Sequence, residues 1–372
     1  MKRVSVLLTL CLLLSVFLMT SCADENNPSV IEHPLYSGTC GDHLTWTLQG
    51  GVLTVSGTGD IYSYIVTVDD VHHGSPPWED HTDLIQSIVI EDGVSCIGAY
   101  AFSNCTNVTD VSIPGSVKTI GFSAFIANMS LKEVRIPSGV EVIEDYAFGG
   151  CISLEKITLS DTVSRIAGDS ILSPFAKTSV KITIDRKNPH FTTSNGILYS
   201  KDMTTLIACP TGKSKHIRIP DTVMTIGETA FCGNKMTDIT LPDSVTVIEN
   251  AAFSFCENLK EITLPDSVTT LRHLAFSQCT GLTSVTLSEN LSFLGTAPFL
   301  GCTALTSVCF RGDVPEISDQ DTNLLALFED VSDDFVIQYI EGAEGWTSPL
   351  WTAPDGNAYN TVMIPRADAS EK

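Results

Sequence analysis

The sequence predicts a repeat solenoid, mainly β with short helical or 3-10 turns. A phrase of about 23 residues recurs along most of the 372-residue chain. Each copy carries one phenylalanine, and steps of 22 or 23 residues separate these positions except across one interruption: Phe102, Phe125, Phe148, Phe231, Phe253, Phe276 and Phe299. A fixed period of this length indicates an irregular leucine-rich repeat, in which each coil packs only against its neighbours.

One regular copy shows how a coil is built. Ile262 and Leu264 point inward from a short strand, and Thr263 between them points outward. A turn at Pro265–Asp266 leads to a second extended piece, and a helical or 3-10 turn follows around Phe276. One coil cannot bury enough apolar surface to fold alone, so stacking and end caps are required.

The first residues predict export. Lys2 and Arg3 precede an apolar run that is too short for a typical membrane span, so residues 1–21 are expected to be a signal peptide. The small residues before Cys22 resemble a bacterial lipobox, which predicts lipidation of Cys22 and a tether over residues 22–34. Met19 stands where such boxes usually carry Leu, and ordinary cleavage after Ala23 is the alternative.

Residues 35–85 are expected to form an N-terminal β-hairpin cap and a linking loop. Apolar residues alternate with polar ones on both sides of Gly50–Gly51, which is typical of a hairpin: Leu44, Trp46, Leu48, Leu53 and Val55. The solenoid is expected over residues 86–305, with an atypical hairpin-bearing repeat at 179–215. Residues 306–372 are expected to form a C-terminal cap and tail.

Several phrases resemble the BspA-like leucine-rich-repeat surface protein family. The opening phrase Gly38–Gly59 is similar to the first module of that family, and Asn195–Pro210 is similar to its hairpin insertion. Phe310–Pro315 and Tyr339–Trp346 resemble its closing segments. The resemblance covers about residues 37–350 and implies a bacterial surface protein that takes part in adhesion.

Composition limits the partners. The chain carries 44 Asp and Glu against 21 Lys and Arg, a net charge of -23. We therefore expect no nucleic-acid partner, because no basic patch exists to release counterions from phosphate. We expect membrane contact only through a lipid anchor, and a monomeric, surface-exposed protein of the cell envelope.

The cysteines follow the repeat. Five of them lie three residues after a repeat phenylalanine, where other copies carry Asn128 and Asn234: Cys105, Cys151, Cys256, Cys279 and Cys302. This slot favours a ladder of stacked thiols over a disulfide framework, because parallel side chains fit disulfide geometry poorly. The redox state stays open.

Two other motifs invite a functional interpretation. The loop that contains His72, His73 and His81 offers imidazoles and carboxylates to a metal ion, although its spacing matches no rigid ligand pattern. Arg311–Gly312–Asp313 is the integrin-recognition tripeptide, but a turn in the repeat explains it equally well. We favour a solvated loop for the histidine segment and a structural turn for the tripeptide.

The outward strand position is the candidate binding surface. It holds one residue per copy: Val89, Ser112, Arg135, Thr158, Thr183, Arg218, Thr240, Thr263 and Thr286. We expect these to lie on one continuous sheet face, along which solenoids bind partners. Arg135, Arg218, Thr240, Thr263 and Thr286 are the predicted contact residues. Threonine also favours exposed strands regardless of function.

We find no nucleophile elbow, paired catalytic carboxylates or phosphate loop, so no enzyme and no cofactor is predicted. The predicted function is a non-catalytic surface lipoprotein that presents the solenoid to host or bacterial surface macromolecules, above all proteins. A structural or carbohydrate-binding accessory lipoprotein is the alternative.

Overall fold

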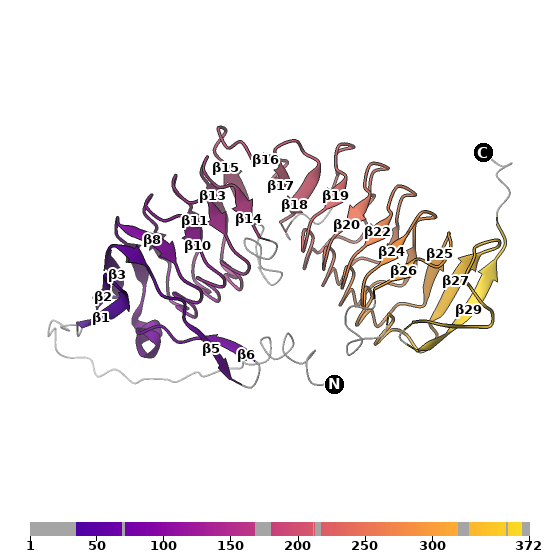
Figure 1. Cartoon of the computed structure of the whole chain (residues 1–372), viewed down its shortest axis with the longest axis horizontal. Helices are drawn as coiled ribbons and strands as arrows, with labels where there is room; N and C mark the ends of the chain where they lie inside the picture. Colours follow the sequence, from indigo (N-terminus) through magenta and orange to yellow (C-terminus); the bar gives the residue numbers. More distant parts are fainter. Residues whose placement is uncertain are drawn as a thin grey trace, which may run out of the picture.

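The computed structural model describes residues 35–68, 71–167, 180–210, 212, 217–318, 327–354 and 356–366. The predicted signal peptide, Cys22 and the tether lie outside these ranges. The described chain is a β-solenoid, which confirms the predicted fold. Its coils follow one another along the longest axis of the molecule (Figure 1).

The N-terminal end begins with the antiparallel strands β1 (Tyr36–Gly41), β2 (Leu44–Gln49) and β3 (Val52–Gly57). Strand β3 then pairs in parallel with β7 (Ser87–Ile90), and β7 pairs with β9 (Asp110–Ser112). The alternating residues predicted as a hairpin therefore form a cap whose last strand is already the first rung of the solenoid.

The first face of the solenoid continues in two further sheets. One contains β11 (Glu133–Arg135), β13 (Lys156–Leu159) and β15 (Lys181–Ile184) in parallel. The other contains β21 (Glu261–Thr263), β23 (Ser284–Thr286), β25 (Ser307–Phe310), β27 (Val336–Ile340), β29 (Ala358–Ile364) and β28 (Leu350–Thr352). Parallel pairing thus continues past residue 305 to β29, and antiparallel β28 closes the edge.

The second face consists of shorter strands. Before the interruption these are β4 (Gly59–Asp60), β8 (Val94–Ile97), β10 (Thr119–Ile120), β12 (Val142–Ile143) and β14 (Arg165–Ile166). After it they are β19 (Thr225–Ile226), β20 (Val247–Ile248), β22 (Thr270–Leu271), β24 (Phe293–Leu294) and β26 (Glu316–Ile317). Two elements lie apart from both faces: the hairpin of β5 (Ile65–Val68) and β6 (Val71–Gly74), and a 3-10 helix at Glu79–Leu84.

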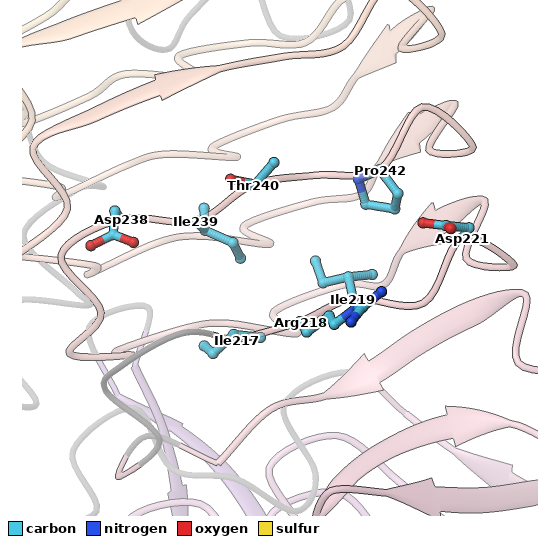
Figure 2. A pocket seen from close by; sticks show the side chains of 8 residues that line it. All are labelled: Ile217, Arg218, Ile219, Asp221, Asp238, Ile239, Thr240 and Pro242. Carbon is cyan, nitrogen blue, oxygen red and sulfur yellow. The ribbon is translucent and has the colours of Figure 1, made fainter.

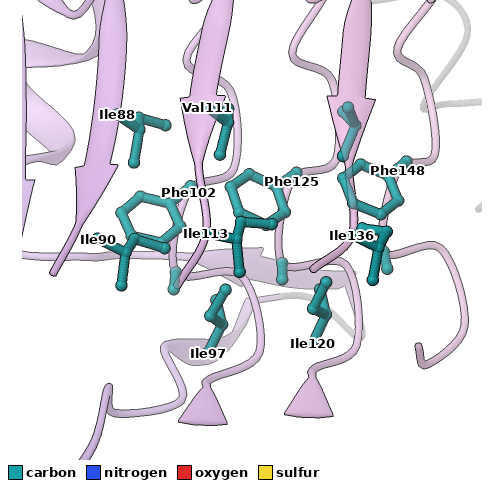
Figure 3. Packing of buried hydrophobic residues seen from close by; sticks show 14 of the residues in the cluster. Ile88, Ile90, Ile97, Phe102, Val111, Ile113, Ile120, Phe125, Ile136 and Phe148 are labelled. Atoms are coloured by element: carbon teal, nitrogen blue, oxygen red, sulfur yellow. The ribbon is translucent and has the colours of Figure 1, made fainter. Parts of the chain in front are cut away.

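The repeat phenylalanines fill the space between the two faces (Figure 3). Phe102, Phe125 and Phe148 are fully buried and stack with ring centroids 5.2 and 5.4 Å apart. The indole of Trp78 extends this column at 5.3 Å from Phe102 and donates a hydrogen bond to the Ala101 carbonyl. Stacked rings at this spacing add to the stability gained from burial.

The turns around the phenylalanines contain single 3-10-type bonds, such as Ser277 N–H to the Leu274 carbonyl at 2.9 Å, but no continuous helix. In one coil the backbone N–H groups of Leu274, Phe276 and Gln278 donate to carbonyls of the following coil at 3.1, 2.8 and 2.6 Å. Leu274 and Gln278 accordingly adopt positive φ values of 56° and 60°. Because these donors bond between coils, they cannot bond along the chain as a helix requires.

One buried position of the repeat holds either asparagine or cysteine, and both side chains donate hydrogen bonds to backbone carbonyls there. The Asn128 amide donates to the carbonyls of Phe102 and Phe125 at 3.0 Å, and the Cys151 thiol donates to the Phe125 carbonyl at 3.3 Å. Cys256 and Cys279 repeat the thiol contact in later coils. The slot therefore needs a small buried donor that satisfies a carbonyl of the preceding turn.

The fifth copy interrupts the stack with three antiparallel strands, β16 (Phe191–Ser194), β17 (Ile197–Ser200) and β18 (Thr205–Ala208). Strand β18 then pairs in parallel with β19 and so restarts the second face. In Figure 1 these strands lie between the two stacks of coils. The buried apolar residues accordingly form two clusters, and residues of this insertion contribute to both.

Candidate functional site

The structure places the predicted contact residues in one register. Val89 pairs with Ser112, and Arg135 pairs with Thr158, which pairs with Thr183. Later in the chain Arg218 pairs with Thr240, and Thr263 pairs with Thr286. The row continues from Thr286 to Cys309 and Gln338.

This row is not one continuous hydrogen-bonded sheet, which corrects our expectation. Its members belong to three sheets, and the pair of Arg218 and Thr240 is an isolated bridge. The largest break lies between β15 and residue 217, where the hairpin insertion replaces a regular strand. After this break the segments of Arg218 and Thr240 are joined by one isolated parallel bridge.

The break is accompanied by a shallow hollow of about 300 Å³. Its lining comes from two neighbouring segments: Ile217, Arg218, Ile219 and Asp221 from one, and Asp238, Ile239, Thr240 and Pro242 from the next. Figure 2 shows these side chains projecting from the two segments. Arg218 and Thr240, two of the five predicted contact residues, thus lie at the same depression.

The chemistry of the hollow suits recognition. Arg218 is exposed, and among the described residues its guanidinium forms no ion pair. Ile217 and Ile239 are half-buried and offer apolar contact, while Asp221 and Asp238 add carboxylates. A cation, two carboxylates and a hydroxyl beside apolar side chains can orient a ligand by hydrogen bonds. These groups include no cysteine, serine or histidine to act as a nucleophile or its base.

A second hollow of about 320 Å³ lies on the other face of the same break. It is lined by residues of β14, β18 and the turns beside them: Asp145, Arg165, Ile166, Ala167, Thr205, Ile207, Gly227 and Glu228. Both hollows adjoin the point at which one stack of coils ends and the next begins.

The remaining predicted contact residues lie outside the two hollows. Arg135 is exposed on β11, Thr263 is exposed on β21, and Thr286 is half-exposed on β23. Neither Thr263 nor Thr286 lines a hollow described above. The sequence analysis did not predict Ile217, Asp221, Asp238 or Ile239 as site residues. The interruption of the 23-residue repeat before residue 217 was the signal that could have indicated them.

The histidine loop gathers no metal site within the described residues. The His81 ring stacks on Tyr36 with ring centroids 3.8 Å apart. His72 and His73 lie on β6, and their side chains are outside the described set. The expectation of a solvated loop without a metal stays a prediction.

The Arg311–Gly312–Asp313 tripeptide has a structural role. The Arg311 guanidinium contacts Asp266 at 2.8 and 3.0 Å, and it also approaches Glu289 at 3.9 Å. An Asp313 carboxylate oxygen accepts a hydrogen bond from the Glu344 backbone N–H at 2.7 Å. Both charged side chains are therefore engaged in joining neighbouring coils.

The stacked thiols are buried. Cys105, Cys151, Cys256, Cys279 and Cys302 are not in disulfides. Burial raises the pKa of Cys105 and of Cys151 to about 12, and it holds the pKa of Cys279 well above its usual range. A thiol that is inaccessible and neutral makes a poor nucleophile, so these cysteines serve packing.

Comparisons with known proteins agree with this architecture. A scan against protein families matches the BspA type leucine rich repeat region, with six copies over residues 80–191 and 209–321. A comparison with curated proteins found no match.

Among solved structures, a leucine-rich repeat protein from Eubacterium ventriosum is similar at 22% identity and a TM-score of 0.65, covering 88% of this chain and 100% of that one. The pneumococcal vaccine antigen PcpA is similar at 20% identity and a TM-score of 0.51, covering 84% and 94%. At these identities the likeness concerns the fold. In the part of the chain that the structure describes, no helix has the length and apolar character needed to cross a bilayer.

Proposed function

The chain belongs to the family of BspA-type leucine-rich-repeat proteins, and we propose that it is a non-catalytic surface protein that binds other proteins through its first face. Repeat solenoids bind partners over extended faces, and protein binding is the role that this family supports. We further propose that contact centres on the Arg218 hollow. That hollow combines an exposed cation without an ion pair among the described residues, apolar side chains and a break in the sheet.

The outward row supports an extended contact on both sides of the hollow. Arg135, Thr263 and Thr286 occupy the repeat position that Arg218 occupies in its own copy, which supports a partner that lies along the row. Arginine is enriched among residues that dominate binding energy, which makes Arg218 the first residue to test.

The test reverses the charge of both arginines in the full chain. Beads coated with wild-type protein or with the Arg135→Glu/Arg218→Glu variant are presented to purified matrix proteins and to intact bacterial and host cells. We expect adhesion of the variant to fall about tenfold or more, as for a loss of central contacts. The matched control is Lys118→Glu/Arg272→Glu, which makes the same charge change beside the second face.

Equal adhesion by the wild type and the arginine variant excludes this face as the contact surface. An equal loss in the control variant shows that net charge, and not a local site, controls adhesion. Binding to a glycan array but to no protein supports the accessory carbohydrate-binding role in place of the adhesin.

We also propose that the protein is exported and anchored by lipid at Cys22. The basic residues, the apolar run and the small residues before Cys22 support this step. Metabolic labelling with a lipid analogue should mark the wild type and not Cys22→Ala. Protease treatment of intact cells should release fragments of the solenoid if the protein lies on the outer surface. A protein that stays intact under that treatment cannot be a surface adhesin.

A further inference from the structure

The positive charge of this acidic chain is concentrated in its centre. Residues 132–218 contain 12 Lys and Arg against 9 Asp and Glu. The preceding residues 23–131 contain 1 against 13, and the following residues 219–372 contain 6 against 22. The field of the whole protein therefore attracts an anion to the central segment and repels it at both ends.

The fold brings five of these cations onto one surface, which we call the central basic face, and this corrects the expectation that the chain has no basic patch. It consists of Arg135, Lys156 and Lys181, outward from β11, β13 and β15, together with Arg186 and Lys187 in the turn after β15. Lys156 and Lys181 are direct partners in the parallel register. Like charges placed opposite each other destabilise a sheet, so packing alone does not explain this pair.

The cations of this face are left available for a ligand. Elsewhere, Lys118, Lys235, Arg272 and Arg311 each form an ion pair with a carboxylate of a neighbouring coil. Within the central basic face, the ion pairs of the described residues include only the contact of Lys156 with Glu133, at 3.1 Å.

Nearby carboxylates are occupied by hydrogen-bond donors of the chain itself. Asp161 accepts a hydrogen bond from the Ser138 hydroxyl at 2.7 Å, and Asp185 accepts one from the Lys187 backbone N–H at 2.9 Å. Arg135, Lys181 and Arg186 are exposed. Their charge is therefore not matched by a partner within the described chain.

We propose that the central basic face binds an anionic polysaccharide that carries carboxylate or sulfate groups. Parallel strands lie about 4.8 Å apart, so the cations repeat along the solenoid axis at a spacing that suits a linear polymer with regular charges. The Thr158 and Thr183 hydroxyls lie 3.0 Å apart among the cations and can hydrogen bond to sugar hydroxyls. This inference goes beyond the proposed protein binding, because it concerns a different class of ligand, although the central basic face shares Arg135 with the proposed protein contact.

The surface fits two other classes of macromolecule less well. Large apolar side chains that are exposed in the described chain lie elsewhere, so this face lacks the anchors that dominate protein interfaces. It also lacks aromatic side chains on which the bases of a single strand would stack.

The experiment passes the full chain over immobilised polygalacturonate, heparin and neutral dextran, and measures the salt concentration needed for elution. We expect retention at low salt on one or both charged polymers and none on dextran.

The variant Lys181→Glu/Arg186→Glu/Lys187→Glu should weaken binding about tenfold or more, because the local field changes sign. The control Lys118→Glu/Lys235→Glu/Arg272→Glu carries the same charge change elsewhere and should retain binding within about twofold. Circular dichroism verifies that each variant is folded.

Several results overturn the proposal. These are absence of wild-type retention on both charged polymers, equal loss in the two triple variants, or tighter binding of poly-glutamate or an oligothymidylate in competition. The last result would assign the face to an acidic protein or to nucleic acid. Arg218→Glu separates this site from the proposed protein contact, since it should reduce adhesion to protein and leave polysaccharide retention unchanged.

Discussion

The coils before the interruption and those after it follow the same repeat but form separate cores. In the first stack the aromatic column runs from Trp78 through Phe102 and Phe125 to Phe148. In the second it runs from Phe231 through Phe253 and Phe276 to Phe299 and Phe328, with ring spacings from 5.0 to 5.8 Å. Each column ends at a different cap, the first at the Trp78 indole and the second at Phe335 and Tyr359. A shared repeat therefore does not guarantee a shared core.

The buried slot also differs between the two stacks. The first alternates Cys105, Asn128 and Cys151, whereas the second carries Cys256, Cys279 and Cys302 in succession. Each of these three thiols donates to a phenylalanine carbonyl of the preceding coil. At the junction Asn188 takes a larger role, because its amide nitrogen donates to the Ser160 and Val163 carbonyls and its oxygen accepts from the backbone N–H groups of His190 and Phe191. In the regular coils the same contacts recur from copy to copy, whereas at the junction the Asn188 side chain makes four hydrogen bonds.

The largest expected effect tests whether the two cores unfold independently. Phe253→Ala removes a fully buried ring from the second column and should lower the free energy of unfolding by about 3–5 kcal/mol. Hydrogen exchange followed by mass spectrometry should show faster exchange in residues 217–310 and little change in residues 87–159. Phe125→Ala is the matched control and should give the opposite pattern. If either substitution accelerates exchange equally in both stacks, the two cores unfold as one unit.

The next effect concerns the junction. Asn188→Ala removes four hydrogen bonds at a fully buried position and should cost about 3 kcal/mol or more, since buried groups without partners cost about 1–3 kcal/mol each. Asn128→Ala is the control inside a regular stack: its amide makes two hydrogen bonds, and its oxygen has no partner in the described chain. Urea unfolding should show a smaller loss for Asn128→Ala. A larger loss there would mean that the junction is no more dependent on its asparagine than a regular coil.

A pH dependence follows from the buried thiols. Burial raises the pKa of Cys105 and Cys151 from 9.0 to about 12. Because the folded state favours the protonated thiol, this contribution to stability is complete below pH 9 and is lost as the pH rises toward 12. Between pH 8 and pH 10 the loss is about 1.4 kcal/mol per thiol. Urea unfolding at the two pH values measures it, and Cys105→Ala/Cys151→Ala should show a smaller decrease. An unchanged decrease would assign the alkaline sensitivity to other groups.

The smallest effect tests the tripeptide. Arg311→Ala removes a partly exposed ion pair and should change the free energy of unfolding by about 1 kcal/mol or less. Cell attachment should be unaffected, because the guanidinium joins coils instead of projecting to a receptor. Asp313→Ala serves as a companion, since it removes only the contact with the Glu344 backbone. A strong loss of attachment in both variants, without loss of stability, would restore the recognition role of the tripeptide.

The sequence by itself determined the coil. The spacing of the phenylalanines, the alternation around Thr263 and the Cys/Asn slot report local packing that every copy repeats, so the fold class and the outward row could be predicted from one pattern. The turns were harder to predict, because their N–H groups bond to the next coil, a partner that a local pattern does not reveal.

Only the tertiary structure decided where the repeat stops being continuous. The break between β15 and residue 217, the hollow beside Arg218 and the four contacts of Asn188 depend on how the hairpin insertion seats against two stacks. The grouping of cations on β11, β13 and β15 likewise needs the register of strands about one repeat apart in the chain. The repeat pattern in the sequence reports packing contacts that successive coils share. The candidate binding sites depend instead on contacts between segments that do not recur from coil to coil.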